Sequence, residues 1–377
     1  MLTRVYIDNF RCFTNFELGF DRLQLLLGGN GTGKSSLLDV VAGLRAAVVT
    51  GGPPAASTLT RWDSRRRQTF EVDVRNPYVD GAGGIYRYRL EYEVPDPAVW
   101  GLVASETLVL DGRPLLVRDP SKAELLDAEG GPQRVLTHPA RAALGMLPSW
   151  PNTEITWFRE FMRRLVVLRP WPAGIRHASD AEAGELDGSG ANFVSWYRQI
   201  DPTLHFDAKQ FLHRSLQEVM PGFESLRFVK TGEKEQVLRT VWAAEHVAAS
   251  GGPFELDLDE LSDGQRVLIL LYTLLALSVP KNAPPMTVLL DEPINYVSLA
   301  EIEPWLRQIE ERTEEGKLQA IVASHHPELL NAWARGSGIR FWREATGPVR
   351  ARRFQTREDD PLTPSERVAR GWEGEDA

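Results

Sequence analysis

The sequence predicts an α/β fold with an appended antiparallel sheet and a helical insertion. A glycine-rich segment, residues 28–36, lies between the apolar run 23–27 and residues 37–44, whose apolar side chains have helical spacing. A second apolar run, residues 287–290, leads into two acidic residues. In residues 85–94, apolar and polar side chains alternate, which is typical of a half-solvated strand. These patterns predict a strand–loop–helix unit and a second buried strand in an α/β core.

The glycine-rich segment has the residues and the context of a phosphate-binding loop. It reads Gly-Gly-Asn-Gly-Thr-Gly-Lys-Ser-Ser, follows a predicted strand and precedes a predicted helix. Glycines let successive backbone N–H groups converge on phosphate oxygens, and the helix presents its positive N-terminus to them. We expect Lys34 to neutralise the β- and γ-phosphates of ATP and Ser35 to bind Mg²⁺. The expected ATP contacts are Gly28, Gly29, Asn30, Gly31, Thr32, Gly33, Lys34, Ser35 and Ser36.

The second apolar run ends in Asp291 and Glu292. We expect Asp291 to bind Mg²⁺, usually through water, and Glu292 to polarise the water that attacks the γ-phosphate. A strand that ends in two acids is common by itself. Its position downstream of a complete phosphate loop is what gives it this interpretation.

Residues 261–266 read Leu-Ser-Asp-Gly-Gln-Arg and precede an apolar helix. The segment resembles the signature motif of the ABC-class ATPases, whose usual form is Leu-Ser-Gly-Gly-Gln, with Asp263 in place of the first glycine. The start of a helix again suits a phosphate, so the Ser262 hydroxyl and the Gly264 backbone N–H can meet a γ-phosphate. The alternative interpretation is a capped core helix that begins at Ser262.

A third apolar run, residues 319–323, ends in Ser324, His325 and His326. The segment resembles the one that carries the switch histidine of the same ATPases, which contacts the γ-phosphate. The position directly after Ser324 assigns that role to His325. A pair of metal ligands is the alternative, but adjacent histidines point apart on most backbones and no third ligand is evident.

These four motifs occur in the order of an ABC-type ATPase head of the RecF/SMC/OLD branch. Residues 7–13, Ile-Asp-Asn-Phe-Arg-Cys-Phe, are similar to the start of that branch. Residues 324–329 resemble the Thr-His-Ser-Pro-Glu-Leu segment of OLD-like AAA-type ATPases. The resemblance implies an ATP-dependent homodimer, in which Ser262 and Gly264 of a second chain close the ATP site.

The chain also departs from its resemblances. The segment between Gly33 and Ser262 is much longer than in transporter ATPases, and its proline and glycine breakers exclude the long coiled coil of SMC heads. The segment after His326 is too short for the nuclease domain of OLD-type proteins. Residues 293–298 lack the aspartate usual in the dimer-contacting loop, and Gln68 is a weak candidate for the glutamine-loop residue.

The motifs divide the chain into four predicted parts. Residues 1–118 form the first part of the ATPase lobe, with the phosphate loop and the antiparallel sheet. Residues 119–254 form a mainly helical insertion. Residues 255–345 carry the signature, the Asp291-Glu292 pair and the switch histidine. Residues 346–377 form a C-terminal strand and a polar tail that frays.

Composition narrows the possible partners. The 377 residues carry a formal net charge of −9, which argues against a globally basic nucleic-acid coat. The basic run at residues 61–67 predicts a solvated loop, with contact to a phosphate backbone as the alternative. The single Cys12, the lack of a secretory signal pattern and the short apolar stretches predict a cytoplasmic chain without membrane insertion.

These features favour a cytoplasmic ATP-hydrolysing switch that dimerises around ATP and Mg²⁺. We expect it to drive a partner protein, encoded nearby, or a nucleic acid, in DNA repair or phage defence. One alternative is the ATPase subunit of a membrane ABC transporter. Another is a self-sufficient nuclease, although no acidic or histidine cluster with metal-ligand spacing lies outside the predicted ATP site.

Overall fold

The computed structural model describes residues 1–52, 58–79, 81, 83–95, 101–120, 122–147, 149–243, 252–355 and 361–371. These residues form two compact units. The first comprises the described residues of Met1–Leu165, Ala334–Asp360 and Arg370–Ala377, and the second those of Val166–Trp333 and Pro361–Ala369. The phosphate loop therefore belongs to the first unit, whereas Asp291, Glu292 and His325 belong to the second.

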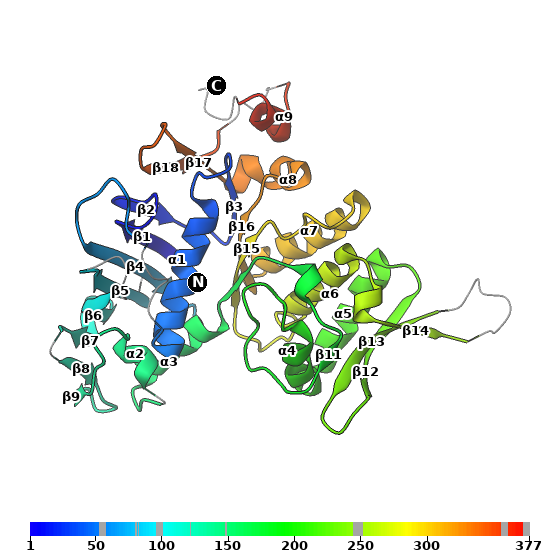
Figure 1. Cartoon of the computed structure of the whole chain (residues 1–377), viewed down its shortest axis with the longest axis horizontal. Helices are drawn as coiled ribbons and strands as arrows, with labels where there is room; N and C mark the ends of the chain where they lie inside the picture. Colours follow the sequence, from blue (N-terminus) through cyan, green and yellow to red (C-terminus); the bar gives the residue numbers. More distant parts are fainter. Residues whose placement is uncertain are drawn as a thin grey trace. The chain divides into compact units, whose positions relative to one another are not determined.

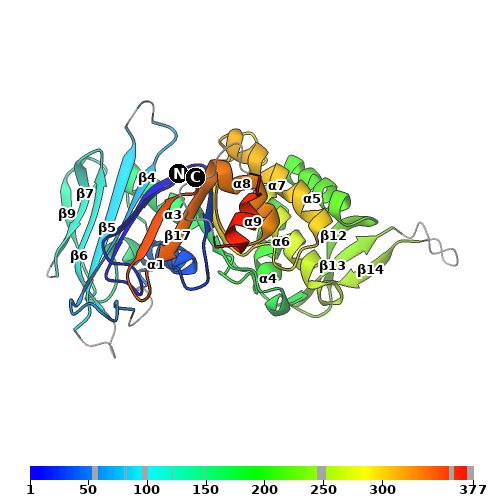
Figure 2. The ribbon, with the colours of Figure 1, turned by 90° about the horizontal axis from the view of Figure 1, so that it is seen from above.

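An antiparallel sheet makes up much of the first unit (Figures 1 and 2). Its strands, in the order in which they pair, are β2 (Phe16–Gly19), β1 (Leu2–Asp8), β4 (Arg67–Arg75), β5 (Ile85–Glu93), β6 (Leu102–Leu110), β7 (Arg113–Arg118), β8 (Ala123–Leu126) and β9 (Pro132–Val135). On β5, Tyr86, Tyr88, Leu90 and Tyr92 are buried, while the residues between them are more exposed. The alternation in the sequence therefore predicted this sheet correctly.

The phosphate loop connects strand β3 (Leu23–Leu27) to helix α1 (Lys34–Thr50). Strand β3 pairs in parallel with β17 (Gly338–Arg343), which pairs antiparallel with β18 (Val349–Arg353). Helix α1 packs against α2 (Ala143–Met146) and α3 (Thr153–Arg164). Leu44 of α1 also lines a small cavity with Phe70 of β4 and Tyr92 of β5, so this helix lies on the antiparallel sheet.

The second unit contains a parallel sheet of β10 (Val166–Leu168), β15 (Met286–Asp291) and β16 (Leu318–Ala323). Every residue of β15 and β16 is buried, as expected for strands covered on both faces. Helix α6 (Asp263–Ala276) packs against α5 (Phe206–Val219) and α7 (Leu299–Glu314). The order of the strands brings the ends of β10, β15 and β16 to one edge of the sheet.

The rest of the second unit is a smaller antiparallel sheet with short helices around it. Its elements are β11 (Ala178–Ser179), β12 (Phe223–Lys230), β13 (Gln236–Trp242), β14 (Phe254–Asp257), α4 (Phe193–Ile200) and the 3₁₀ turns Pro172–Gly174, Asp201–Thr203 and Leu258–Glu260. Helix α8 (Pro327–Ser337) follows the switch-histidine segment, and helix α9 (Pro364–Ala369) comes after the last strand, β18.

The predicted helical insertion at residues 119–254 requires correction. The segment contains helices α2 to α5, but it also contains strands β8 to β13. Burial does not alternate regularly along β12 or β13, and β12 has only one buried residue, so a search for periodicity does not find these strands. The segment is also not one body, because it divides between the two units at residues 165 and 166.

The tail prediction is also partly wrong. Residues 364–369, which fall within the predicted fraying tail, form helix α9, and the amide of Ser365 donates to Asn331 Oδ1 at 3.1 Å. The remaining tail positions 358–360 and 372–377 lie outside the described residues. In the described part of the chain, no helix combines the length and the apolar character that crossing a bilayer requires.

Packing around α1 leads to a stability prediction. A Cβ on Gly145 of α2 would lie 1.9 Å from the backbone nitrogen of Gly51, at the end of α1. Gly145→Ala should therefore lower the free energy of unfolding by about 1–3 kcal/mol through overpacking. A Cβ on Gly336 of α8 has nothing within 4 Å, so Gly336→Ala should instead add up to about 1 kcal/mol. Denaturant unfolding of both variants tests this, and equal effects would contradict the packing described.

Candidate functional site

The phosphate loop begins at a position where only glycine fits. Gly28 has a φ of 139°, and a Cβ there would lie 2.2 Å from the carbonyl oxygen of Phe341 in the adjacent strand β17. The backbone therefore turns sharply out of the sheet at the end of β3. The loop then leads directly into the N-terminus of α1, where unpaired backbone N–H groups can bind an anion.

The side chain of Lys34 folds back over this loop. It is only 8% exposed, and its Nζ donates to the carbonyl oxygens of Gly28 at 2.6 Å and Gly29 at 3.1 Å. Thr32 Oγ1 also donates to the Gly29 oxygen at 2.8 Å. The ammonium group is thus held inside the curve of the loop, where it can meet phosphate oxygens.

The Asn-Phe-Arg segment near the N-terminus contacts the first turns of α1. Arg11 donates to Ser36 Oγ at 3.1 Å and forms an ion pair with Asp39. Asn9 is fully buried, and its side-chain amide donates to the carbonyl oxygens of Arg65 and Arg67. The segment that carries the family resemblance therefore supports the phosphate loop from one side.

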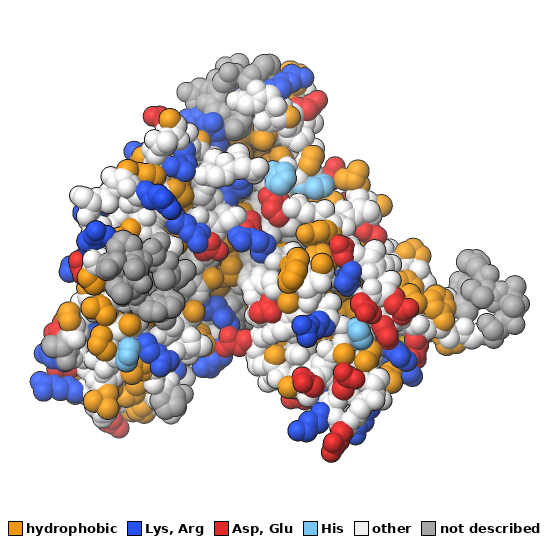
Figure 3. Space-filling view, viewed as in Figure 1, with side chains coloured by type: hydrophobic (Ala, Val, Ile, Leu, Met, Phe, Trp, Pro, Cys, Tyr) orange, Lys and Arg blue, Asp and Glu red, His pale blue; other side chains and the backbone are white. Residues whose placement is uncertain are grey.

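Gln68, the weak candidate for the glutamine-loop residue, is buried in the first unit. Its side chain is 3% exposed and donates to the carbonyl oxygen of Asn9 at 2.8 Å, which is a structural contact inside the first unit. In the basic run at residues 61–67, Arg65 pairs with Asp8 and Asp63, and Arg67 pairs with two glutamates. On the face shown in Figure 3, Lys and Arg side chains lie scattered among acidic and neutral ones.

Asp291 lies at the end of β15 with its side chain 5% exposed. The guanidinium of Arg169 donates to its Oδ2 from Nε at 2.6 Å. No sequence pattern pointed to this arginine, because it follows a three-residue strand with no motif around it. The signal lies in the fold: β10 pairs with β15 so that Leu168 is opposite Leu290, and the next residues on the two strands are Arg169 and Asp291.

Glu292 is held in a strained backbone position by contacts at the end of β16. Its φ is 48°, a left-handed conformation that few non-glycine residues adopt, and its N–H donates to the Ala323 oxygen at 2.8 Å. One carboxylate oxygen accepts from Ser324 Oγ at 2.8 Å, and the other is 2.6 Å from Nδ1 of His325. Such strain at a strand end is typical of functional sites.

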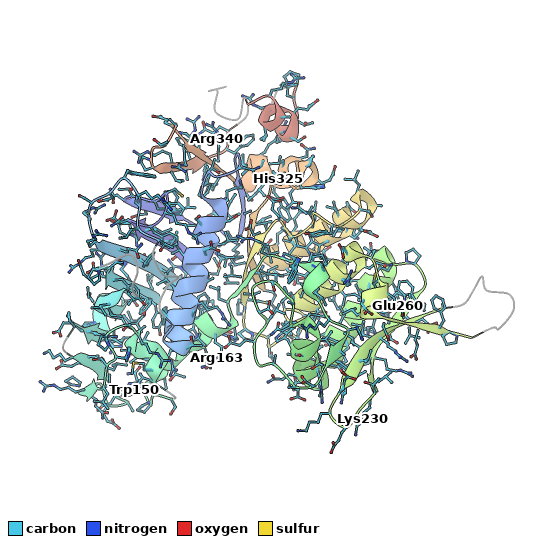
Figure 4. All side chains as sticks on the ribbon, viewed as in Figure 1. Trp150, Arg163, Lys230, Glu260, His325 and Arg340 are labelled. Atoms are coloured by element: carbon cyan, nitrogen blue, oxygen red, sulfur yellow. The ribbon has the colours of Figure 1, made fainter. Side chains whose placement is uncertain are left out.

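The two adjacent histidines have different surroundings. His325, labelled in Figure 4, has a side chain that is 61% exposed and paired with Glu292. His326 precedes helix α8, and its Nδ1 accepts from the N–H of Glu328 at 3.3 Å, as an N-cap does. Burial lowers the pKa of His326, which keeps the ring neutral and able to accept this hydrogen bond. This capping role supports the assignment of the switch position to His325.

At the start of helix α6, the signature segment has a capping serine and a closely packed glycine. Ser262 is exposed and caps the helix: its Oγ accepts from the Gln265 N–H at 3.2 Å, and Gln265 Oε1 accepts from the Ser262 N–H. This is the capped helix that the sequence offered as an alternative, yet the hydroxyl proton can still donate. Gly264 is buried, and a Cβ there would lie 2.5 Å from the Tyr296 oxygen, so close packing explains this glycine.

Asp263, the departure from the usual signature, pairs with Arg266 one turn further along α6. Arg266 also donates to the carbonyl oxygen of Pro172 at 3.1 Å. Through Arg266, Asp263 therefore connects the start of α6 to the turn that follows β10.

The donor set suits Mg²⁺. The carboxylate of Asp291 and the hydroxyl of Ser35 are hard oxygen donors of the kind that this ion prefers. Asp291 is a nearly buried carboxylate that needs a positive partner, and a guanidinium supplies that charge in this structure. The residues therefore fit the metal that the phosphate loop implies.

The different surroundings of the two histidines give a matched pair of variants. His326→Ala removes a helix cap and should lower the free energy of unfolding by about 1 kcal/mol. The stabilising contribution of His326 should be present above its unfolded pKa and be lost as the pH falls, because only the neutral ring accepts. His325→Ala should leave stability nearly unchanged. Thermal unfolding between pH 5 and 8 measures both; a larger loss in His325→Ala would contradict these roles.

Two protein-family models match segments of this chain. Residues 1–43 match a family described as "AAA ATPase domain", and residues 204–331 match one described as "AAA domain, putative AbiEii toxin, Type IV TA system". The first segment contains the phosphate loop, and the second contains the signature, Asp291, Glu292 and His325. No match was found among curated proteins.

Solved structures with a similar fold include SMC head domains. An SMC head bound to the C-terminal winged-helix domain of ScpA has a TM-score of 0.54 at 13% identity, covering 93% of this chain and 98% of that one. An Smc head with an extended coiled coil, bound to the C-terminal domain of ScpA derived from Pyrococcus furiosus, has 0.53 at 12% identity, covering 93% and 96%. The SMC head domain from Thermotoga maritima has 0.47 at 16% identity, covering 94% and 99%. Two AAA-type ATPase family models thus match segments of this chain, and the chain shares the fold of SMC head domains, as the resemblance to ABC-type P-loop ATPases of the RecF/SMC/OLD type implied.

Proposed function

We propose that this chain binds ATP and hydrolyses it to ADP and phosphate, and uses the cycle to drive a partner protein or a nucleic acid. The observation that carries the proposal is the pairing of Glu292 with His325 and Ser324 beside Asp291. A carboxylate held at a strand end by two neighbours can orient the water that attacks the γ-phosphate. The phosphate loop elsewhere in the chain would bind the nucleotide.

The residues divide the chemistry between them. Loop N–H groups and Lys34 bind the phosphates, and the proton-accepting carboxylate of Glu292 orients the attacking water. As an imidazolium, His325 would donate from Nδ1 to Glu292 and from Nε2 to the γ-phosphate. When bound by Ser35 and Asp291, Mg²⁺ would neutralise charge on the β- and γ-phosphates.

We propose further that hydrolysis takes place in an ATP-dependent homodimer. Ser262 is exposed at the start of α6, with a hydroxyl proton and the positive end of a fourteen-residue helix to offer. In this arrangement Ser262 and the Gly264 N–H of one chain complete the γ-phosphate site of the other. Each ATP is then part of the interface, and each hydrolysis event releases it.

The partner is the least defined part of the proposal. Two of the similar SMC heads were solved with ScpA domains bound, which supports a protein partner for this chain. DNA repair or phage defence is the setting that the RecF/SMC/OLD resemblance favours. Two guanidiniums of the basic run at residues 61–67, those of Arg65 and Arg67, pair with carboxylates, which weakens the case for nucleic-acid contact there.

The first functional prediction concerns ATP binding at the phosphate loop. Lys34→Ala should weaken ATP binding about 10- to 100-fold, because the phosphates lose a buried, charge-assisted hydrogen-bond donor. Lys317→Ala is the control, since this lysine is also bonded to a backbone carbonyl but lies outside the motifs. Calorimetric titration with ATP measures both variants, with circular dichroism to confirm folding. Wild-type affinity in folded Lys34→Ala protein would refute the phosphate loop.

The second functional prediction concerns the ATP-dependent dimer. Glu292→Gln keeps the shape of the side chain but not its charge, so hydrolysis should fall at least about 100-fold while ATP binding persists. This variant should accumulate as an ATP-dependent dimer in size-exclusion chromatography with light scattering. Adding Ser262→Arg should break the dimer without removing ATP from the monomer.

Ser298→Arg is the matched control for the cap, because Ser298 begins α7 with the same type of capping box. It should cost a similar amount of stability and leave the dimer intact. A Glu292→Gln protein that stays monomeric at saturating ATP and Mg²⁺, or equal effects of the two arginine substitutions, would contradict a site completed by the second chain.

A further inference from the structure

Arg169 forms an ion pair with the carboxylate that the proposed function assigns to the metal. Asp291 is the carboxylate expected to bind the metal, yet an arginine of the same unit already occupies it. Nε and Nη2 of Arg169 lie 2.6 and 2.5 Å from the same oxygen, Oδ2. Two donors converging on one oxygen form a directed, charge-assisted contact.

The fold brings these two side chains together by strand register. Leu168 and Leu290 are partners in the parallel pair of β10 and β15, so Arg169 and Asp291 leave the sheet side by side at the same edge. The backbone of Arg169 is also fixed, because its N–H donates to the Gly188 oxygen at 2.7 Å. Any change in the pair must therefore come from the arginine side chain.

The loop that holds Arg169 is itself tightly bonded. Asp187 accepts hydrogen bonds from the backbone or side chain of Ser189, Ala191 and Asn192. Asn192 Oδ1 accepts from the Asp187 N–H at 2.9 Å in return. Although burial alone would raise the pKa of Asp187, these hydrogen bonds hold it below its ordinary value. The loop is thus a firm support for the residue beside the metal carboxylate.

Exposure differs sharply between the two partners. The side chain of Asp291 is 5% exposed, whereas that of Arg169 is 56% exposed. The carboxylate is thus fixed and poorly hydrated, while the guanidinium has solvent into which it can move. A half-exposed arginine can leave without opening the core, and the buried carboxylate then requires another cation.

From this geometry we propose that Arg169 is an intramolecular competitor for Mg²⁺: it holds Asp291 in the nucleotide-free protein and must release Oδ2 before the metal binds there. The inference rests on the proposed function, because it takes Asp291 as the metal ligand. The two N–H donors occupy both lone pairs of Oδ2, so neither Mg²⁺ nor a water molecule bound to it can use this oxygen until the guanidinium has moved. Arg169 is a positioning residue in this account, acting through Asp291.

The competition gives a metal requirement that can be measured without turnover. In Arg169→Gln, the Mg²⁺ concentration for half-maximal binding of a non-hydrolysable ATP analogue should fall about 3- to 10-fold, the value of one partly exposed charged pair. Mn²⁺ binding followed by electron paramagnetic resonance should show the same shift. Arg307→Gln is the matched control, since Arg307 is a similarly exposed arginine of the second unit that pairs with Glu218 and Glu303. It should leave the requirement unchanged.

A measurement on the unmodified sequence keeps the test independent of how the variant folds. In ¹⁵N-arginine-labelled protein, the Nε–H signal of Arg169, assigned by its loss in Arg169→Lys, should move on addition of Mg²⁺ with the analogue and stay in place with the analogue alone. An unchanged or raised Mg²⁺ requirement in Arg169→Gln, or an immobile Nε–H signal, overturns the competition. Wild-type protein that does not bind the analogue at all would instead refute the proposed function.

Discussion

Two neighbouring carboxylates at the end of one buried strand form the constraint on which the site depends. Asp291 and Glu292 are adjacent in the sequence, and each carboxylate has hydrogen-bond partners of its own. The structure gives Asp291 a guanidinium from the end of β10, and gives Glu292 a hydroxyl and an imidazole from the end of β16. The left-handed backbone at Glu292 turns its side chain to that second partner. The order β10–β15–β16 is therefore also what separates the two acids chemically.

Close backbone contacts help to fix the phosphate loop and the start of α6. Gly28 lies against the Phe341 carbonyl and Gly264 against that of Tyr296, so both motifs use glycine where another chain segment approaches. This packing links each motif to the element beside it. Helix α6 packs at Gly264 against Tyr296, which follows Glu292 in the chain. This contact links the surface proposed to bind the second chain to the carboxylate proposed for hydrolysis.

The sequence predicted the parts of this structure that depend on local patterns. Strands β3, β15 and β16, helices α1, α4, α5 and α6, and the alternating strands of the first unit all carry strong periodicity or a motif, and the structure has them. Burial does not alternate regularly along β12 or β13, and β10 is only three residues long, so periodicity did not find them. Arg169 was missed for the same reason, since its position beside Asp291 follows from strand pairing across more than a hundred residues.

The roles of Asp291, Arg169, Glu292 and His325 meet in a single state, the protein with ATP and Mg²⁺ bound. A crystal structure of Glu292→Gln with both bound tests the account most directly. The account predicts one nucleotide with its phosphates at residues 28–36, the metal at Asp291, His325 at the γ-phosphate and Arg169 turned away from Oδ2. A nucleotide bound elsewhere, or a metal-loaded site in which Arg169 still contacts Oδ2, would contradict it.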